Sequence, residues 1–150
     1  MAVVDINTGL TLRPEHGYVL LAFLFAIFAQ SLWMMFQVGA ARRRYKVFYP
    51  NLYADKSNPN ADAFNCVQRG HQNTLENLPT FIALLLVAGL KFPVTASIAG
   101  VIYTLGKIAY FKGYASGKPA ARQRGSFSYI GLLTLMGCVA YWAFLLLTGK

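Results

Sequence analysis

Four apolar runs, each about long enough to cross a lipid bilayer as a helix, dominate this chain of 150 residues. They cover about residues 17–39, 64–90, 95–116 and 127–148. Hydrophobic residues make up 56% of the chain, which is too apolar for an ordinary soluble domain. The sequence therefore predicts an all-α integral membrane protein, in which residues 1–150 form a single domain, a bundle of four transmembrane helices.

The net charge of +9 comes from 14 Lys and Arg against 5 Asp and Glu. The bases lie in short segments between the apolar runs, so membrane topology and anionic lipid explain them better than nucleic acid. The first and third loops are basic, whereas the second has only Lys91, which predicts that loops one and three are cytosolic. The run Arg42–Arg44 is either a topology signal or an anion site at the membrane surface. The endoplasmic reticulum and the outer mitochondrial membrane are equally compatible with this pattern.

Two polar stripes interrupt the apolar pattern at one depth. Arg69, Asn73 and Glu76 are spaced to share one face of the second helix, and they lie toward its cytosolic end. In the third helix, Lys107, Tyr110 and Tyr114 share a face in the same way. Tyrosines at helical spacing are also common in cores and interfacial belts, but a lysine on the same stripe favours a polar cleft. Ionisable groups at this depth indicate a functional site by default.

Such groups complement a small zwitterion with several carboxylates, because guanidinium groups bind carboxylates bidentately. Glutathione fits this description, and a nearby guanidinium would also favour its nucleophilic thiolate. Phosphate or an anionic lipid would be complemented nearly as well. The histidines and cysteines, His16, His71, Cys66 and Cys138, show no metal-binding spacing, so no metal is predicted.

The segments F-N-C-V-Q-R-G-H-Q-N-T-L-E (residues 64–76) and K-I-A-Y-F-K-G-Y-A-S-G-K-P-A-A-R-Q-R-G (107–125) resemble the MAPEG superfamily, membrane-associated proteins in eicosanoid and glutathione metabolism. The resemblance is strongest to its type 3 microsomal glutathione S-transferase branch and covers nearly the whole chain. It implies a homotrimer that binds glutathione between neighbouring subunits near the cytosolic face. It also implies an enzyme that activates glutathione as a thiolate, to reduce lipid hydroperoxides or to conjugate lipophilic electrophiles such as epoxides. The alternative is a non-catalytic lipid-binding or scaffold protein of the same superfamily.

The resemblance also implies roles for individual residues. Arg122 matches the arginine that polarises the thiol, and Arg43 matches an assisting arginine. One extra residue lies between Tyr114 and Arg122, which leaves Arg124 as an alternative to Arg122. His71 matches a residue that reaches a neighbour's ligand, although an inter-helix hydrogen bond is the other reading of it. The glutathione-binding positions are Arg42, Arg69, His71, Asn73, Glu76, Lys107 (in place of an arginine), Tyr110 and Tyr114.

Overall fold

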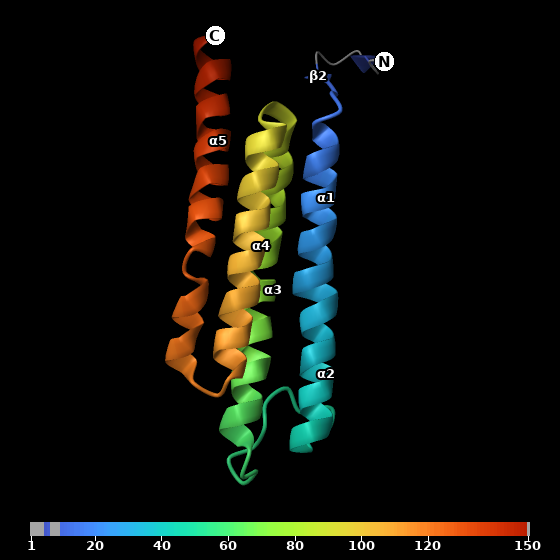
Figure 1. The fold of residues 1–150 in the computed structure, drawn as a ribbon, viewed down its shortest axis with the longest axis vertical. Coiled ribbons are helices and arrows are strands. Elements are labelled where there is room, and N and C mark those ends of the chain that lie inside the picture. The colour runs from blue at the N-terminus through green and yellow to red at the C-terminus, as the bar shows by residue number, and fades with distance from the viewer. Residues whose placement is uncertain (1–4, 7–9, 150) are drawn as a thin grey trace.

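A computed structural model describes residues 5–6 and 10–149. Long helices lie side by side in a bundle (Figure 1), and each of the four candidate spans is long and apolar enough to cross a membrane. The prediction of an all-α membrane bundle with four spans is thus confirmed for its helices. Ahead of the bundle, two short antiparallel strands pair, which the sequence did not suggest. The elements are β1 (Asp5–Ile6), β2 (Leu10–Thr11), α1 (His16–Ile27), η1 (Phe28–Trp33), α2 (Met34–Tyr45), α3 (Ala61–Lys91), α4 (Pro93–Ala115), η2 (Pro119–Gly125) and α5 (Ser128–Thr148).

The first span is longer than predicted. α1, the π-helical turn η1 and α2 follow one another as one helical stretch from His16 to Tyr45, so the basic run Arg42–Arg44 forms its last turn instead of starting a loop. Cationic side chains are favourable there because they oppose the partial negative charge at a helix C-terminus. The helix stops at Lys46, which has a left-handed backbone with φ of 55°.

The segment between the predicted third and fourth spans, residues 117–126, is largely helical. α4 continues to Ala115, and η2 is a 3₁₀ helix over Pro119–Gly125. Pro119 starts this helix with a backbone angle that suits its first turn. Figure 1 shows η2 and the loop between α2 and α3 near one end of the bundle, with the start of α1, the α3–α4 turn and the end of α5 at the other.

Two apolar clusters form the interior, and a buried polar layer lies between them. The layer centres on Gln30 in η1, whose side-chain amide donates to Thr104 Oγ1 in α4 at 3.5 Å. Its backbone carbonyl oxygen accepts a hydrogen bond from His71 Nε2 in α3 at 3.1 Å. The layer therefore ties the first span to both central helices. The cluster nearer the start of α1 and the end of α5 consists of Val19, Ala22, Ala26, Phe81, Leu85, Ala88, Ala96, Ala99, Tyr103 and Leu135. The cluster nearer the basic end consists of Met34, Val38, Ala41, Val47, Phe64, Val67 and Phe111.

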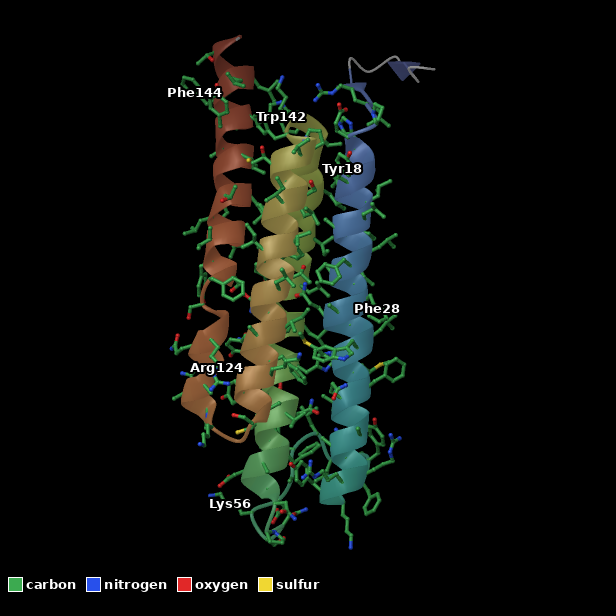
Figure 2. The ribbon with its side chains drawn as sticks, in the orientation of Figure 1. Tyr18, Phe28, Lys56, Arg124, Trp142 and Phe144 are labelled. Carbon is green, nitrogen blue, oxygen red and sulfur yellow. The ribbon has the colours of Figure 1, made fainter. Side chains whose placement is uncertain are left out.

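Large apolar side chains cover the outside of the bundle, as expected where lipid tails are the solvent. Phe28 on η1 and Phe144 on α5 are more than half exposed, and both are labelled in Figure 2. α5 contributes only Ser128, Gly131 and Leu135 to the buried interior, so most of its surface faces outward.

The contact between α4 and the start of α5 depends on glycine. A Cβ atom at Gly106 would lie 2.7 Å from both Cα and N of Ser128, and at Gly131 it would lie 2.8 Å from the Tyr103 backbone nitrogen. Small residues allow this close approach of helices in membranes. The approach matters for function because it brings the start of α5 and the preceding η2 against the polar stripe of α4.

We expect Gly106→Ala to destabilise the protein, because the new methyl group meets backbone that has to shift. The cost of such overpacking is about 1–3 kcal/mol. The matched control is Gly137→Ala, since a Cβ there meets nothing within 4 Å and the substitution gains up to about 1 kcal/mol of helix propensity. Thermal unfolding in detergent should give a lower Tm for Gly106→Ala and an equal or higher Tm for Gly137→Ala. Equal Tm values for the two variants would show that α5 is free to move away from α4.

Candidate functional site

The two polar stripes face each other across the α3–α4 contact. The ammonium group of Lys107, which is 6% exposed, donates a hydrogen bond to Asn73 Oδ1 at 3.2 Å. It also lies 5.0 Å from the centroid of the Tyr110 ring. The positive charge of Lys107 is thus stabilised by an amide oxygen on α3 and by an aromatic ring on α4, the helix that carries Lys107. Such a polar contact inside the bundle fixes where the two helices meet.

A polar cavity of about 260 Å³ opens beside this contact, between α3, α4, η2 and the start of α5. Arg122 reaches it from η2, where its Nη1 donates to the Pro119 carbonyl oxygen at 2.9 Å and its guanidinium lies 5.7 Å from the Tyr114 ring. Arg124, labelled in Figure 2, belongs to the same short helix. It is exposed and does not line the cavity. The cavity is lined by Asn73, Asn77, Tyr103, Lys107, Tyr110, Arg122, Gln123, Gly125, Ser126, Ser128, Tyr129 and Leu132.

A second, more open depression of about 500 Å³ is lined by Arg69, which is on the same face of α3 as Asn73, and by Tyr114. Arg69 Nη1 donates to Glu76 Oε1 at 2.7 Å, in an ion pair whose side chains are 42% and 46% exposed. The Tyr110 and Tyr114 rings, 5.8 Å apart, connect the two hollows along α4. Six of the predicted residues line one hollow or the other, namely Arg69, Asn73, Lys107, Tyr110, Tyr114 and Arg122, and Glu76 is tied to them through Arg69.

Three other predicted residues line neither hollow. His71 is on the opposite face of α3, 8% exposed, where it makes the inter-helix hydrogen bond to Gln30. Arg42 is also 8% exposed, and its guanidinium donates to the carbonyl oxygens of Asn51 at 2.8 Å and Leu52 at 3.4 Å. It therefore anchors the loop between α2 and α3. Arg43 is exposed and lines neither hollow.

Sequence reasoning did not select the residues that the start of α5 adds to the cavity. Ser126, Ser128 and Tyr129 line it, as does Gln123 in η2. These residues show no helical periodicity in the sequence, because they come from the start of a helix and from a 3₁₀ helix. The one available signal was Tyr129, a phenol at the start of an otherwise apolar span. Among residues 5–6 and 10–149, no group of three or more His, Cys, Asp and Glu side chains is placed to hold a metal ion.

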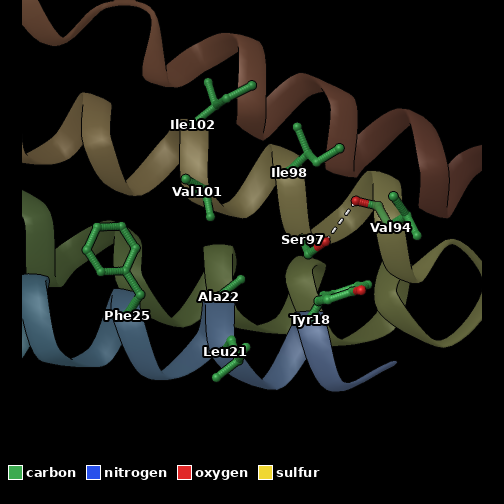
Figure 3. Close-up of a pocket in the computed structure, with 9 residues that line it drawn as sticks. All are labelled: Tyr18, Leu21, Ala22, Phe25, Val94, Ser97, Ile98, Val101 and Ile102. Atoms are coloured by element: carbon green, nitrogen blue, oxygen red, sulfur yellow. Dashed lines mark hydrogen bonds between the residues drawn. The ribbon is translucent and has the colours of Figure 1, made fainter. Parts of the chain in front are cut away.

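A larger apolar groove of about 620 Å³ runs between α1 and α4 (Figure 3). Its α4 wall includes Val94, Ile98 and Val101, which at 100° per residue lie on the opposite face of the helix from Lys107 and Tyr110. The groove carries no ionisable group except the phenol of Tyr18. It is therefore separate from the polar cavity.

These features define a class: an integral membrane protein of four helices with a cationic, phenol-lined cavity near the basic end of the bundle. Within this class, the chain belongs to the MAPEG family, whose model matches residues 20–144. It is 36% identical over 125 residues to microsomal glutathione S-transferase 2 of Bos taurus, which covers 81% of this chain and 82% of that protein. It is 38% identical over 113 residues to the Homo sapiens protein of the same name, with 73% of each chain covered. Leukotriene C4 synthase of Bos taurus is 31% identical over 114 residues, with 75% and 69% covered.

The family predicted from the sequence is thus confirmed, but the predicted type 3 branch is not. The named relatives are a type 2 glutathione S-transferase and a leukotriene C4 synthase.

We expect Arg42→Gln to loosen the loop between α2 and α3, since Arg42 supplies hydrogen bonds to its carbonyl groups. At about 1.5 kcal/mol or more for a charged hydrogen bond, local opening should rise about tenfold. Limited trypsin digestion, followed by mass spectrometry of cleavage after Lys56, measures this opening. Arg43→Gln is the matched control, because it removes the same charge from an exposed neighbour, and cleavage there should stay near the wild-type rate. Equal acceleration in both variants would mean that charge, and not the loop contact, controls the loop.

Proposed function

We propose that this protein is a membrane-bound glutathione transferase with glutathione peroxidase activity. The observation that supports it is the polar cavity, where Lys107, Arg122 and Asn73 gather with three phenols inside the bundle, those of Tyr103, Tyr110 and Tyr129. Cations and amides in this arrangement complement the carboxylates and peptide groups of glutathione. The names of the relatives, a glutathione S-transferase and a leukotriene C4 synthase, point to the same class of reaction.

In this proposal, Lys107 and Arg69 bind the carboxylates of glutathione, and Asn73 binds a peptide group. Glu76, already paired with Arg69, is placed to accept the ammonium group of the ligand while it orients that guanidinium. Tyr110 and Tyr114 form the wall between the two hollows and donate from their phenols. These assignments rest on the match to the family motif, on the Lys107–Asn73 hydrogen bond between α4 and α3, and on the adjacent rings of Tyr110 and Tyr114 on α4.

Arg122 is the residue we assign to the thiol. Its guanidinium borders the cavity, and a nearby positive charge favours the thiolate over the thiol. We choose it over Arg124 because Arg124 is exposed and does not line the cavity.

The thiolate then attacks a lipophilic electrophile that enters from the bilayer. With an epoxide, a carbon–sulfur bond forms, a carbon–oxygen bond breaks, and the alkoxide takes up a proton. With a lipid hydroperoxide, the sulfur takes the terminal oxygen as a sulfenic acid while the lipid leaves as an alcohol. A second glutathione then gives the disulfide and water.

We propose that the site is completed by a second copy of the chain in a homotrimer. A cavity of about 260 Å³ is below the ~300–1,000 Å³ range of typical ligand pockets. Arg43, exposed at the basic end of α2, is available to assist a neighbour's site. Arg42 and His71 are already bonded within their own protomer, so any contact with a neighbour's ligand requires those bonds to rearrange.

The same proposal places the basic loops and the cavity on the cytosolic side, in the endoplasmic reticulum or the outer mitochondrial membrane. The evidence for this orientation is the excess of basic residues in the first and third loops, because cytosolic loops are enriched in Lys and Arg. The electrophile is then any lipophilic molecule, such as an epoxide or a lipid hydroperoxide, that reaches the bundle through the bilayer.

We expect Arg122→Gln to weaken thiolate stabilisation and so to lower turnover. Loss of a charged contact of about 1.5–3 kcal/mol predicts a decrease between about tenfold and 150-fold. The measurements are thiolate absorbance with bound glutathione and turnover of an epoxide and a hydroperoxide in proteoliposomes.

Two variants of the same charge make this test specific. Lys118→Gln, an exposed residue before η2, should leave both readouts near the wild-type values. If Arg124→Gln loses the thiolate signal while Arg122→Gln keeps it, the assignment passes to Arg124. Equilibrium dialysis that detects no glutathione binding to the wild-type protein would rule out the enzyme and favour the scaffold alternative.

A further inference from the structure

A small hollow at the basic end of the bundle, between α2 and α4, lies outside the candidate site. We call it the α2–α4 hollow. Its volume is about 220 Å³, and it shares no lining residue with the polar cavity. It is lined by Gln37, Ala40, Ala41, Arg44, Tyr45, Val67, Phe111 and Ala115.

The hollow exists because small residues face one another across the two helices. Ala40 and Ala41 on α2 and Ala115 on α4 leave space where larger side chains would meet. The floor is apolar, since Val67 and Phe111 belong to the buried cluster at this end of the bundle. A surface of this kind accepts a hydrocarbon chain.

Two exposed cations flank this apolar floor. Arg44 lines the hollow in the last turn of α2, beside the Tyr45 ring at 5.5 Å. Lys112 Nζ lies 5.8 Å from the ring of Trp33, and Trp33 packs edge-on against Phe111 with the ring centroids 5.5 Å apart. Trp33, Gln37 and Arg44 fall on one stripe of the first span, so the Trp33–Lys112 contact lies along the same side of this span as Arg44.

Within the part of the chain that the structure describes, neither cation has an ion-pair partner. Among the described residues, the ion pairs are Arg13–Glu15 and Arg69–Glu76, and no acidic side chain lines the hollow. Basic pockets between transmembrane helices at the cytoplasmic side attract anionic lipid headgroups, and tryptophan is common at this level of a membrane.

We propose that the α2–α4 hollow binds an anionic phospholipid, whose headgroup phosphate binds Arg44 while an acyl chain follows the apolar floor toward Trp33, with Lys112 adding positive charge beside that floor. The occupant is a lipid because the site combines uncompensated positive charge with a hydrocarbon-lined floor at a membrane boundary. This inference rests on the fold and charges alone and does not depend on glutathione chemistry.

Fluorescence quenching of Trp33 tests the proposal on the full-length protein in nanodiscs. Trp142→Phe leaves Trp33 as the single tryptophan of the chain, which has two. Phosphatidylserine with brominated acyl chains, present as a minor component, should quench Trp33 more than brominated phosphatidylcholine at the same mole fraction. The preference should fall about fivefold for each charge removed in Arg44→Gln and Lys112→Gln.

Two further pairs of variants separate a site from general surface charge. Lys56→Gln with Lys118→Gln removes the same charge from the same end of the bundle and should keep the preference. Ala40→Leu fills the hollow without changing charge and should abolish the preference, whereas Ala143→Leu, an exposed alanine on α5, should not. Equal quenching by both lipids, or a preference that survives Ala40→Leu, would overturn the proposal. Loss of the oligomer in Ala40→Leu, at unchanged lipid preference, would identify the hollow as a contact between subunits instead.

Discussion

A charged group inside a membrane bundle needs its partners from the protein, because hydrocarbon supplies none. Lys107 is that group here. It is 6% exposed, it donates to Asn73 on the neighbouring helix, and it lies over the ring of Tyr110. The polar cavity opens beside this contact, and the close approach of Gly106 and Ser128 brings η2 with Arg122 to its rim. The position of the site therefore follows from where one buried ammonium group is stabilised.

Three consecutive arginines at the end of α2 have different environments, because successive residues of a helix point 100° apart. Arg42 turns inward and anchors the following loop. Arg43 is exposed, and Arg44 turns toward α4, where it borders the α2–α4 hollow. A run that reads as a single topology signal thus supplies a structural contact, a free cation and one side of a proposed lipid site.

Helical periodicity predicted much of this arrangement. Arg69, Asn73 and Glu76 do share a face of α3, and Lys107, Tyr110 and Tyr114 share a face of α4, with the two faces meeting as expected. Helical periodicity did not predict the parts of the site that lie outside long α-helices. The 3₁₀ helix η2 resembled a loop because Gly, Pro and basic residues dominate it, and Ser126, Ser128 and Tyr129 gave no pattern to follow. The anchoring role of Arg42 was hidden because its partners are backbone carbonyl groups, which every residue carries.

The sequence alone determined the four spans, the end of the bundle that is basic, the depth of the polar stripes, and the family to which they belong. All of these depend on hydrophobicity and spacing within a single helix, which are local properties. Only the tertiary structure decided which polar groups share a cavity, which of Arg122 and Arg124 borders it, and that His71 bonds to Gln30 across the bundle. Those contacts join residues far apart in the chain. They are set by the rotation and axial position of each helix, which depend on how small residues such as Gly106 let neighbouring helices pack.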